Sequence, residues 1–398
     1  MYRKYDVGES VTQQDIVWWK DWKFWILFLV INMSGNLCFD YIFPYKLILI
    51  FVFLVITAYS FIKNYMTKQA LLFILLFCAI LLLQGFYTSE NYSFSSTIHI
   101  LLKVCTGILT LLILQKKFIP YYVNIIFFFS IISLCCFTYN AMGGGVIPYL
   151  TMDKTLIDGG RIYRVSSMIY TQLYGPTGGL TLRNCGPFWE PGAFQGFLNL
   201  AIMLLLLSKD ALSKKCIVKV CCLTVAVITT FSTGGYIVLF CIILYALCTT
   251  DRISVTDKIY LFVVLTLLLT VCFFSLDFLY KKVSTDKGRL GVSLDSFGDG
   301  IYLLFGYGYS EESFKQSDLV VAGSIFSLIR YMGVIGLGMF FATLLGVNLT
   351  KPKLFFAIVI FLILMNEPFL TAGPFWWSIP FLWKYIEEIR ETVESPDL

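Results

Sequence analysis

The sequence is poor in charge and in histidine. Only 14% of its 398 residues are charged and one is a histidine, whereas 58% are hydrophobic and the mean hydropathy is +0.79. A chain of this composition has lipid as its main solvent. The scarcity of charge therefore excludes an ordinary soluble domain. It predicts an integral membrane protein whose partner is the lipid bilayer, with no nucleic acid.

Several motifs that supply catalytic chemistry are also missing. The chain has no G-x-x-x-x-G-K-[ST] loop to cradle phosphates, no Asp-x-Asp pair to hold a sugar-nucleotide metal, and no Cys/His spacing suited to zinc. Most of the twelve cysteines lie inside apolar runs, where a thiol packs as a small hydrophobe. We expect no metal and no cofactor, so the energy for any reaction must come with the substrate.

Long apolar runs predict an all-α, polytopic membrane protein that forms a single transmembrane domain over residues 1–398. A helix needs about 20 apolar residues to cross the hydrocarbon core, and by that measure the chain has about 12 crossings. We place them at 22–39, 41–62, 69–87, 97–115, 118–141, 191–208, 216–232, 234–250, 258–280, 319–345, 353–371 and 374–388.

The distribution of lysine and arginine predicts the orientation. Alternate short loops carry them, whereas the connections 88–96, 232–235 and 366–374 carry none. Basic short loops tend to remain cytoplasmic, so both termini are expected there. The two long loops, 142–190 and 281–318, then share the external face. Structureless loops of this length are uncommon unless they function, and we expect the two to fold together as a lid; variable surface decoration is the alternative.

Both long loops are rich in cations. Guanidinium groups suit bidentate recognition of phosphate, so the set indicates an anionic, phosphorylated lipid headgroup above the bundle. Ordinary ion pairs with the loop aspartates are the alternative. The cations are Lys154, Arg161, Arg164 and Arg183 in the first loop, and Lys281, Lys282, Lys287, Arg289 and Lys315 in the second.

The stretch RNCGPFWEPGAFQ, residues 183–195, stands at the mouth of an apolar run. Pro191 suits the first turn of a helix, and Glu190 is favoured there by the helix dipole. Glu190 is thus either a helix-start acid or a carboxylate that orients a substrate hydroxyl, beside a flat face for a sugar ring offered by Phe188 and Trp189. A carboxylate stabilised by the dipole is a weak base, which favours orientation over proton abstraction.

Three ionisable residues fall within or near predicted crossings. Arg330, about three turns into its helix, either lines a lipid-diphosphate cavity or pairs with Glu367 or Asp277. His99 and Lys103 are spaced to share one helix face. A buried hydrogen-bonding role is favoured for His99 over catalysis.

Four segments in the second half of the chain resemble bacterial O-antigen and capsular polysaccharide polymerases. Members of that family carry an Arg, ten residues and then a Gly in each large periplasmic loop. Arg164 with Gly175 and Arg289 with Gly300 match this spacing. The resembling segments are 186–201, 231–236, 304–309 and 327–338.

The resemblance implies an enzyme of the bacterial inner membrane that joins undecaprenyl-diphosphate-linked oligosaccharide repeats at the periplasmic face, without metal or nucleotide. Preorganised cations would stabilise the departing diphosphate. We assign this role to Arg289, with Glu190 as the second catalytic residue. Substrate binding is assigned to Arg161, Arg164, Arg183, Trp189, Lys287 and Arg330. A chain-length regulator protein is left open as a further partner.

Two alternatives remain. O-antigen ligases share this architecture but usually carry a His in the second large loop, and this loop has none. A flippase or other polysaccharide transporter would also suit 12 crossings. Transporters usually place their sites near the midplane and often show repeats, whereas this chain has no internal repeat and gathers its charges in the external loops.

Overall fold

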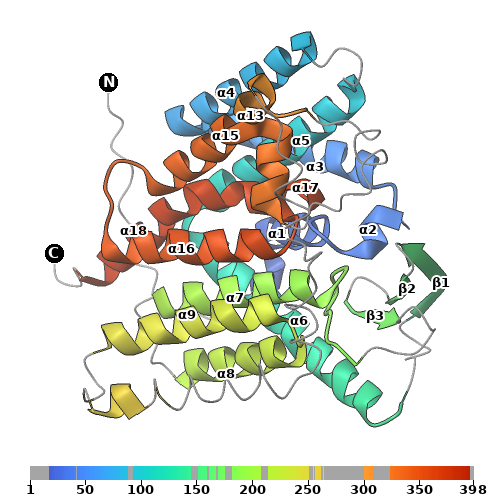
Figure 1. Cartoon of the computed structure of the whole chain (residues 1–398), viewed down its shortest axis with the longest axis vertical. Helices are drawn as coiled ribbons and strands as arrows, with labels where there is room; N and C mark the ends of the chain where they lie inside the picture. The colour runs from blue at the N-terminus through green and yellow to red at the C-terminus, as the bar shows by residue number, and fades with distance from the viewer. Residues whose placement is uncertain are drawn as a thin grey trace.

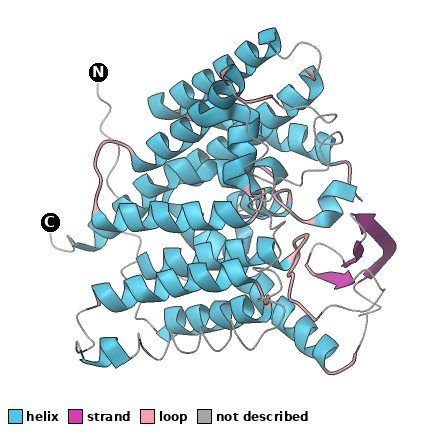
Figure 2. Cartoon of the chain, viewed as in Figure 1, coloured by secondary structure: helices cyan, strands magenta, loops and turns pink. Residues whose placement is uncertain are grey.

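The computed structural model is a bundle of helices with a small sheet at one side (Figures 1 and 2). It describes residues 18–41, 43–87, 93–144, 151–158, 161–166, 169–174, 182–207, 214–250, 254, 256–260, 263, 300–308 and 323–394. The helices are α1 (Trp22–Asn32), α2 (Leu37–Tyr41), α3 (Tyr45–Ile62), α4 (Lys68–Tyr87), α5 (Phe94–Leu114), α6 (Phe118–Ala141), α7 (Pro191–Leu207), α8 (Lys214–Thr229), α9 (Thr233–Thr249), α13 (Ile301–Phe305), α15 (Ser324–Leu345), α16 (Lys351–Asn366), α17 (Phe369–Ala372) and α18 (Ile379–Glu394). Short 3-10 turns lie at η1 (Trp18–Lys20), η2 (Gln115–Lys117) and η3 (Phe375–Ser378).

Several of the described helices have the length and surface of membrane spans. Among the described residues, four segments are long and apolar enough to cross a bilayer: Tyr45–Ile62, Lys68–Tyr87, Phe94–Ala141 and Ser324–Leu345. The outer faces of α3 and α4 expose large apolar side chains, including Phe51 at 67%, Phe61 at 85% and Phe86 at 85%. Water does not solvate such a surface favourably, and lipid does. The protein is membrane-embedded, while the count of twelve crossings stays a prediction.

Three of the predicted crossings are interrupted. The segment predicted at 22–39 ends as α1 at Asn32, because Gly35 adopts a positive φ of 139° and Ser34 turns its hydroxyl to accept a hydrogen bond from Phe375 N (2.8 Å). The segment predicted at 353–371 ends at Asn366, since Pro368 cannot continue the hydrogen-bond ladder of α16. The segment predicted at 319–345 begins at Ser324 and is kinked at Gly333. Most of 258–280 lies outside the described residues.

The described chain is almost entirely helical, as predicted, and the exception is a small three-stranded antiparallel sheet within the first long loop. Its strands, β1 (Thr151–Asp158), β2 (Arg161–Ser166) and β3 (Thr171–Tyr174), follow in the order β1-β2-β3. Leu156 pairs with Tyr163, and Tyr163 with Leu173. The β-branched and aromatic residues of 162–165 favour a strand, which hydropathy at the scale of a membrane span does not detect.

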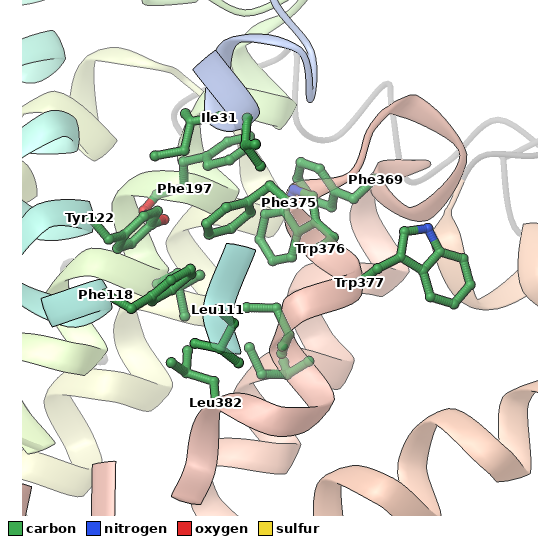
Figure 3. Close-up of a cluster of buried hydrophobic side chains, with 14 of the residues drawn as sticks. Ile31, Leu111, Phe118, Tyr122, Phe197, Phe369, Phe375, Trp376, Trp377 and Leu382 are labelled. Carbon is green, nitrogen blue, oxygen red and sulfur yellow. The ribbon is translucent and has the colours of Figure 1, made fainter. Parts of the chain in front are cut away.

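Helix α7 forms the centre of the bundle, and nearly all of its side chains are buried. Phe197 stacks on Phe188 at 4.2 Å between ring centroids, and its carbonyl accepts a hydrogen bond from the Tyr122 hydroxyl (2.8 Å). Tyr122 in turn stacks on Phe375 at 5.0 Å. Figure 3 shows this aromatic cluster, in which Phe369 and Trp376 also lie face to face at 4.2 Å. These contacts join α6, α7, α17 and η3, so the N-terminus of α7 has a fixed position.

The basic short loops lie at one end of the bundle, here called the lysine end. Lys116 approaches Glu388 of α18 to 4.0 Å, and Lys117 pairs with Asp21 at 3.0 Å. One cavity is lined together by residues from 67–69, 343–348 and 380–387. The alternation of charge along the sequence therefore corresponds to a separation in space. In Figure 1 this end lies at the left and the sheet at the right.

At the lysine end, Asp21 fixes the start of α1. Its carboxylate accepts hydrogen bonds from Lys23 N (3.0 Å), Lys117 Nζ (3.0 Å) and Tyr121 Oη (2.7 Å). Burial alone would raise the pKa of Asp21, but these hydrogen bonds outweigh burial and hold that pKa below its ordinary value.

Candidate functional site

The stretch 182–190 is a rigid turn at the end of the bundle opposite the lysine end. Gly186 has a positive φ of 54°, and its N–H donates to Asn184 Oδ1 (3.0 Å). Asn184 is itself fully buried and donates through Nδ2 to Thr229 Oγ1 (2.9 Å). The carbonyl of Glu190 accepts from Ala193 N (3.1 Å), so α7 begins as the sequence predicts, with Pro191 in its first turn.

Only one of the two aromatic side chains predicted to offer a flat face for a sugar ring is accessible. Phe188 is fully buried against Phe197, so its expected role as a flat face for a sugar ring is wrong. Trp189 is half-buried, with its ring edge-on to Phe369 at 5.9 Å and its backbone N–H bonded to the carbonyl of Gly35 (3.0 Å). Glu190 is half-buried beside it. Trp189 and Glu190 thus remain partly accessible at the start of α7.

Arg183 connects this turn to the bend between α8 and α9. Its Nε donates to the carbonyl of Thr230 (3.2 Å) and its Nη2 to that of Phe231 (3.0 Å). Phe231 has a positive φ of 48°, which a bulky residue rarely adopts. The guanidinium satisfies carbonyls at this strained bend, so Arg183 positions the turn as well as adding positive charge near it.

Sequence reasoning assigned no site role to Glu367, considering it only as a partner for Arg330. Its side chain is only 4% exposed and lies against Gly192, where any Cβ would overlap the carboxylate. Its carbonyl accepts from Ser324 N (2.9 Å) and Ser324 Oγ (2.7 Å). The positive ends of the α7 and α15 dipoles favour an ionised group here. The available signal was an acid directly before a proline next to an apolar run, since Glu190-Pro191 precedes such a run and Glu367-Pro368 follows one.

Arg330 lies next to the kink of α15. Its carbonyl accepts from Tyr307 N (2.7 Å), and that of Tyr331 accepts from Gly308 N (3.2 Å) and Gln84 Nε2 (2.6 Å). Among the described side chains, no ion pair joins Arg330 to Glu367, and the alternative partner Asp277 lies outside the described residues. The half-buried Arg330 side chain lies where the described part of the second long loop meets α15 and α4.

His99 and Lys103 both face Tyr45, as their helical spacing predicts. The His99 ring is edge-on to the Tyr45 ring at 5.5 Å, and Lys103 Nζ lies 5.5 Å from the same centroid. Lys103 also donates to the carbonyl of Thr371 (2.7 Å). The pair therefore joins α3, α5 and α17.

The structure places the other predicted site residues unevenly. Arg161 and Arg164 lie in β2, with Asp158 and Gln172 as their register partners. Strand β3 bonds to the rigid turn through Thr171 N and the carbonyl of Gly186 (2.7 Å), which brings the sheet beside Trp189 and Glu190. Lys287 and Arg289 lie outside the described residues.

The four segments that carry the family resemblance pack in two pairs. Asn199 of the first segment donates through Nδ2 to the carbonyl of Gly235 in the second (3.1 Å). Gly306 of the third packs directly on the backbone of the fourth at Tyr331, and Gly333 packs on the carbonyl of Leu304. Glu367 connects the two pairs, because it touches Gly192 and binds the first residue of α15.

Comparison with known proteins assigns the chain to no family. No family model matches the chain, and no curated protein is similar to it.

Proposed function

We propose that this protein is a polymerase of undecaprenyl-diphosphate-linked oligosaccharide repeats, acting at the external face of a bacterial inner membrane in O-antigen or capsule biosynthesis. A hydroxyl of the incoming lipid-linked repeat attacks the anomeric carbon at the reducing end of the growing chain. A glycosidic bond forms, the bond from that carbon to the diphosphate breaks, and the hydroxyl proton leaves to the diphosphate or to solvent. Undecaprenyl diphosphate departs.

The observation that carries the proposal is the packing of the resembling segments in two pairs, with Glu367 between Gly192 at the start of α7 and Ser324 at the start of α15, beside a sheet whose central strand includes Arg161 and Arg164. An ionisable group buried in a membrane protein is expensive and is by default a sign of function. Several cations on one side of such a cluster suit a substrate with two phosphates.

The roles divide by chemistry. Arg289 is proposed to stabilise charge on the leaving diphosphate, with Arg161, Arg164 and Lys287 holding the phosphate-bearing substrates. Glu190 orients the attacking hydroxyl next to Trp189, and Arg183 positions the turn that carries both. Arg330 lies at the α15 kink on the path of the lipid.

The test is reconstitution in vesicles with undecaprenyl-diphosphate-linked repeats. The expected result is a ladder of products without added nucleotide and in the presence of EDTA. Arg289→Ala should abolish chain growth while leaving the protein in the membrane, whereas Arg390→Ala, which removes a guanidinium near the lysine end, should not. Wild-type product lengths from Arg289→Ala would remove Arg289 from the site.

Glu190 has a separate test, because orientation and proton abstraction predict different results. Glu190→Gln keeps a hydrogen-bond acceptor and should retain a measurable part of the rate, whereas Glu190→Ala should not. Equal and complete loss in both variants, with unchanged thermal stability, would make Glu190 a base.

The two alternatives give other products. A ligase would transfer the chain to a lipid A core rather than lengthen it. A transporter would leave the lipid-linked repeat on the cytoplasmic leaflet when the protein is lost, whereas loss of a polymerase leaves single repeats capping the outer surface.

A further inference from the structure

A cavity of about 490 Å³ opens at the lysine end, far from the site described above. It lies between the start of α4, the ends of α5 and α15, the start of α16, and α18. Nothing in the proposed polymerase reaction uses it. The lining residues that matter most are Thr67, Lys68, Lys353, Trp383, Lys384 and Glu387.

The lining carries more positive than negative charge, since three lysines face one glutamate. Among the described side chains, the only ion pair that these lysines make is the loose one between Lys384 and Glu388, at 3.9 Å. Lys68 and Lys353 have no carboxylate within that range in the same part of the chain. Lys68 and Lys384 are exposed, so solvent offsets part of their charge, and Lys353 is the buried lysine of the set.

The burial of Lys353 makes its positive charge energetically unfavourable without a partner. Only 9% of the residue is exposed, and among the described residues its Nζ donates to one carbonyl, that of Asn348 at 3.2 Å. Lysine is rarely buried unless it is paired, because an ammonium loses its hydration without compensation. Gly346 leaves the space beside this ammonium open, since a Cβ there would lie 3.1 Å from Nζ. An anion in the cavity would supply the missing partner.

The start of a helix reinforces the preference for an anion. The cavity contains the first turn of α4, where Thr67 Oγ1 caps Ala70 N (3.2 Å) and the helix dipole is positive. The residue Trp383 lines the same cavity and is 4% exposed. Leu112, Leu344 and Phe381 contribute apolar parts of the wall, and Gln69, Thr343 and Asn348 contribute polar ones.

We propose that this cavity binds a phosphate group, carried either by the headgroup of an anionic phospholipid or by a soluble molecule. Its three lysines and helix N-terminus offer more donors than a carboxylate has acceptors, and a phosphate presents several anionic oxygens. The site lies at the end of the bundle where the basic loops gather, which is where anionic lipid headgroups attract cations.

The test uses the full-length protein in detergent, with phosphatidylglycerol and inorganic phosphate as separate probes and phosphatidylcholine and chloride as their references. The readouts are melting temperature and, for the lipid, binding by native mass spectrometry. The informative variant is Lys68→Gln/Lys384→Gln, which leaves the buried Lys353 in place. The matched control is Lys63→Gln/Lys351→Gln, which removes two exposed lysines of the same end that do not line the cavity.

The cavity variant should bind the effective probe about 25-fold more weakly, at roughly fivefold for each lysine near a phosphate. The control should bind as the wild type does. Stabilisation by phosphatidylglycerol alone identifies a headgroup site, and stabilisation by inorganic phosphate identifies a soluble ligand. Equal weakening in both variants, or no stabilisation of the wild type by either probe, overturns the proposal. Because no oligosaccharide is present, these outcomes are independent of polymerase activity.

Discussion

The packing of α13 on the kink of α15 depends on Gly333, and Gly333→Ala tests it. Gly333 has φ 67° and ψ −176°, a conformation essentially restricted to glycine, and its added Cβ would overlap the backbone at Leu304. Strain of this kind costs about 1–3 kcal/mol. Displacement of α13 also breaks the hydrogen bonds from Tyr307 N and Gly308 N, at about 0.5–1.5 kcal/mol each. The expected destabilisation is about 2–6 kcal/mol.

Gly338 provides the matched control in the same helix. A Cβ there meets nothing within 4 Å, and its backbone is helical. Gly338→Ala should therefore be neutral or stabilise the helix by about 0.5–1 kcal/mol. Thermal unfolding in detergent should show a fall of roughly 5 °C or more for Gly333→Ala, and none for Gly338→Ala. A Gly333→Ala protein that melts with the wild type would refute the close packing of α13 on α15.

Three further substitutions test contacts elsewhere. Arg183→Lys keeps the charge but cannot reach both carbonyls of the α8–α9 bend, so stability should fall by about 1–3 kcal/mol; an unchanged melting temperature with lost chain growth would instead assign Arg183 to the substrate. The lowered pKa of Asp21 means that its contribution is present above the ordinary carboxyl pKa and is lost as the pH falls through the lowered value. Asp21→Asn should therefore flatten the loss of melting temperature between pH 5 and pH 3, and an unchanged slope would contradict the hydrogen bonds drawn to Asp21. Gly107→Ala places a Cβ on the carbonyl of Pro374 and should destabilise by about 2–4 kcal/mol despite the better helix propensity of alanine, as thermal unfolding would show.

Hydropathy predicts the helices that match a bilayer in length. The segments α3, α4, α5 and α6 begin and end within a few residues of the predicted crossings, because each is a continuous apolar run bounded by polar residues. Breaks within an apolar run are harder to predict. The kink at Gly333 arises from a partner segment more than twenty residues earlier in the chain, and no local pattern distinguishes Gly333 from Gly338.

The candidate site could be predicted where local rules decide it. Pro191 and Glu190 start α7 because proline and acids suit a helix N-terminus anywhere. Phe188 and Glu367 could not be placed in this way, since their burial depends on segments distant in sequence, α6 at Phe129 for the first and α7 at Gly192 for the second. A local stretch of sequence shows that a residue is aromatic or acidic, but it does not show which residues pack against that side chain in the fold.

The central place of α7 has a consequence for how the chain assembles during synthesis. Gln195 and Asn199 are completely enclosed, and Asn199 bonds to Gly235 of α9, a helix that the ribosome has not yet made when α7 emerges. Until α9 is made, Asn199 Nδ2 keeps its bond to Gln195 Oε1 within α7 (2.9 Å) but lacks the carbonyl of Gly235. The order of translation therefore places α7 in the membrane before the polar contacts of its amides are complete.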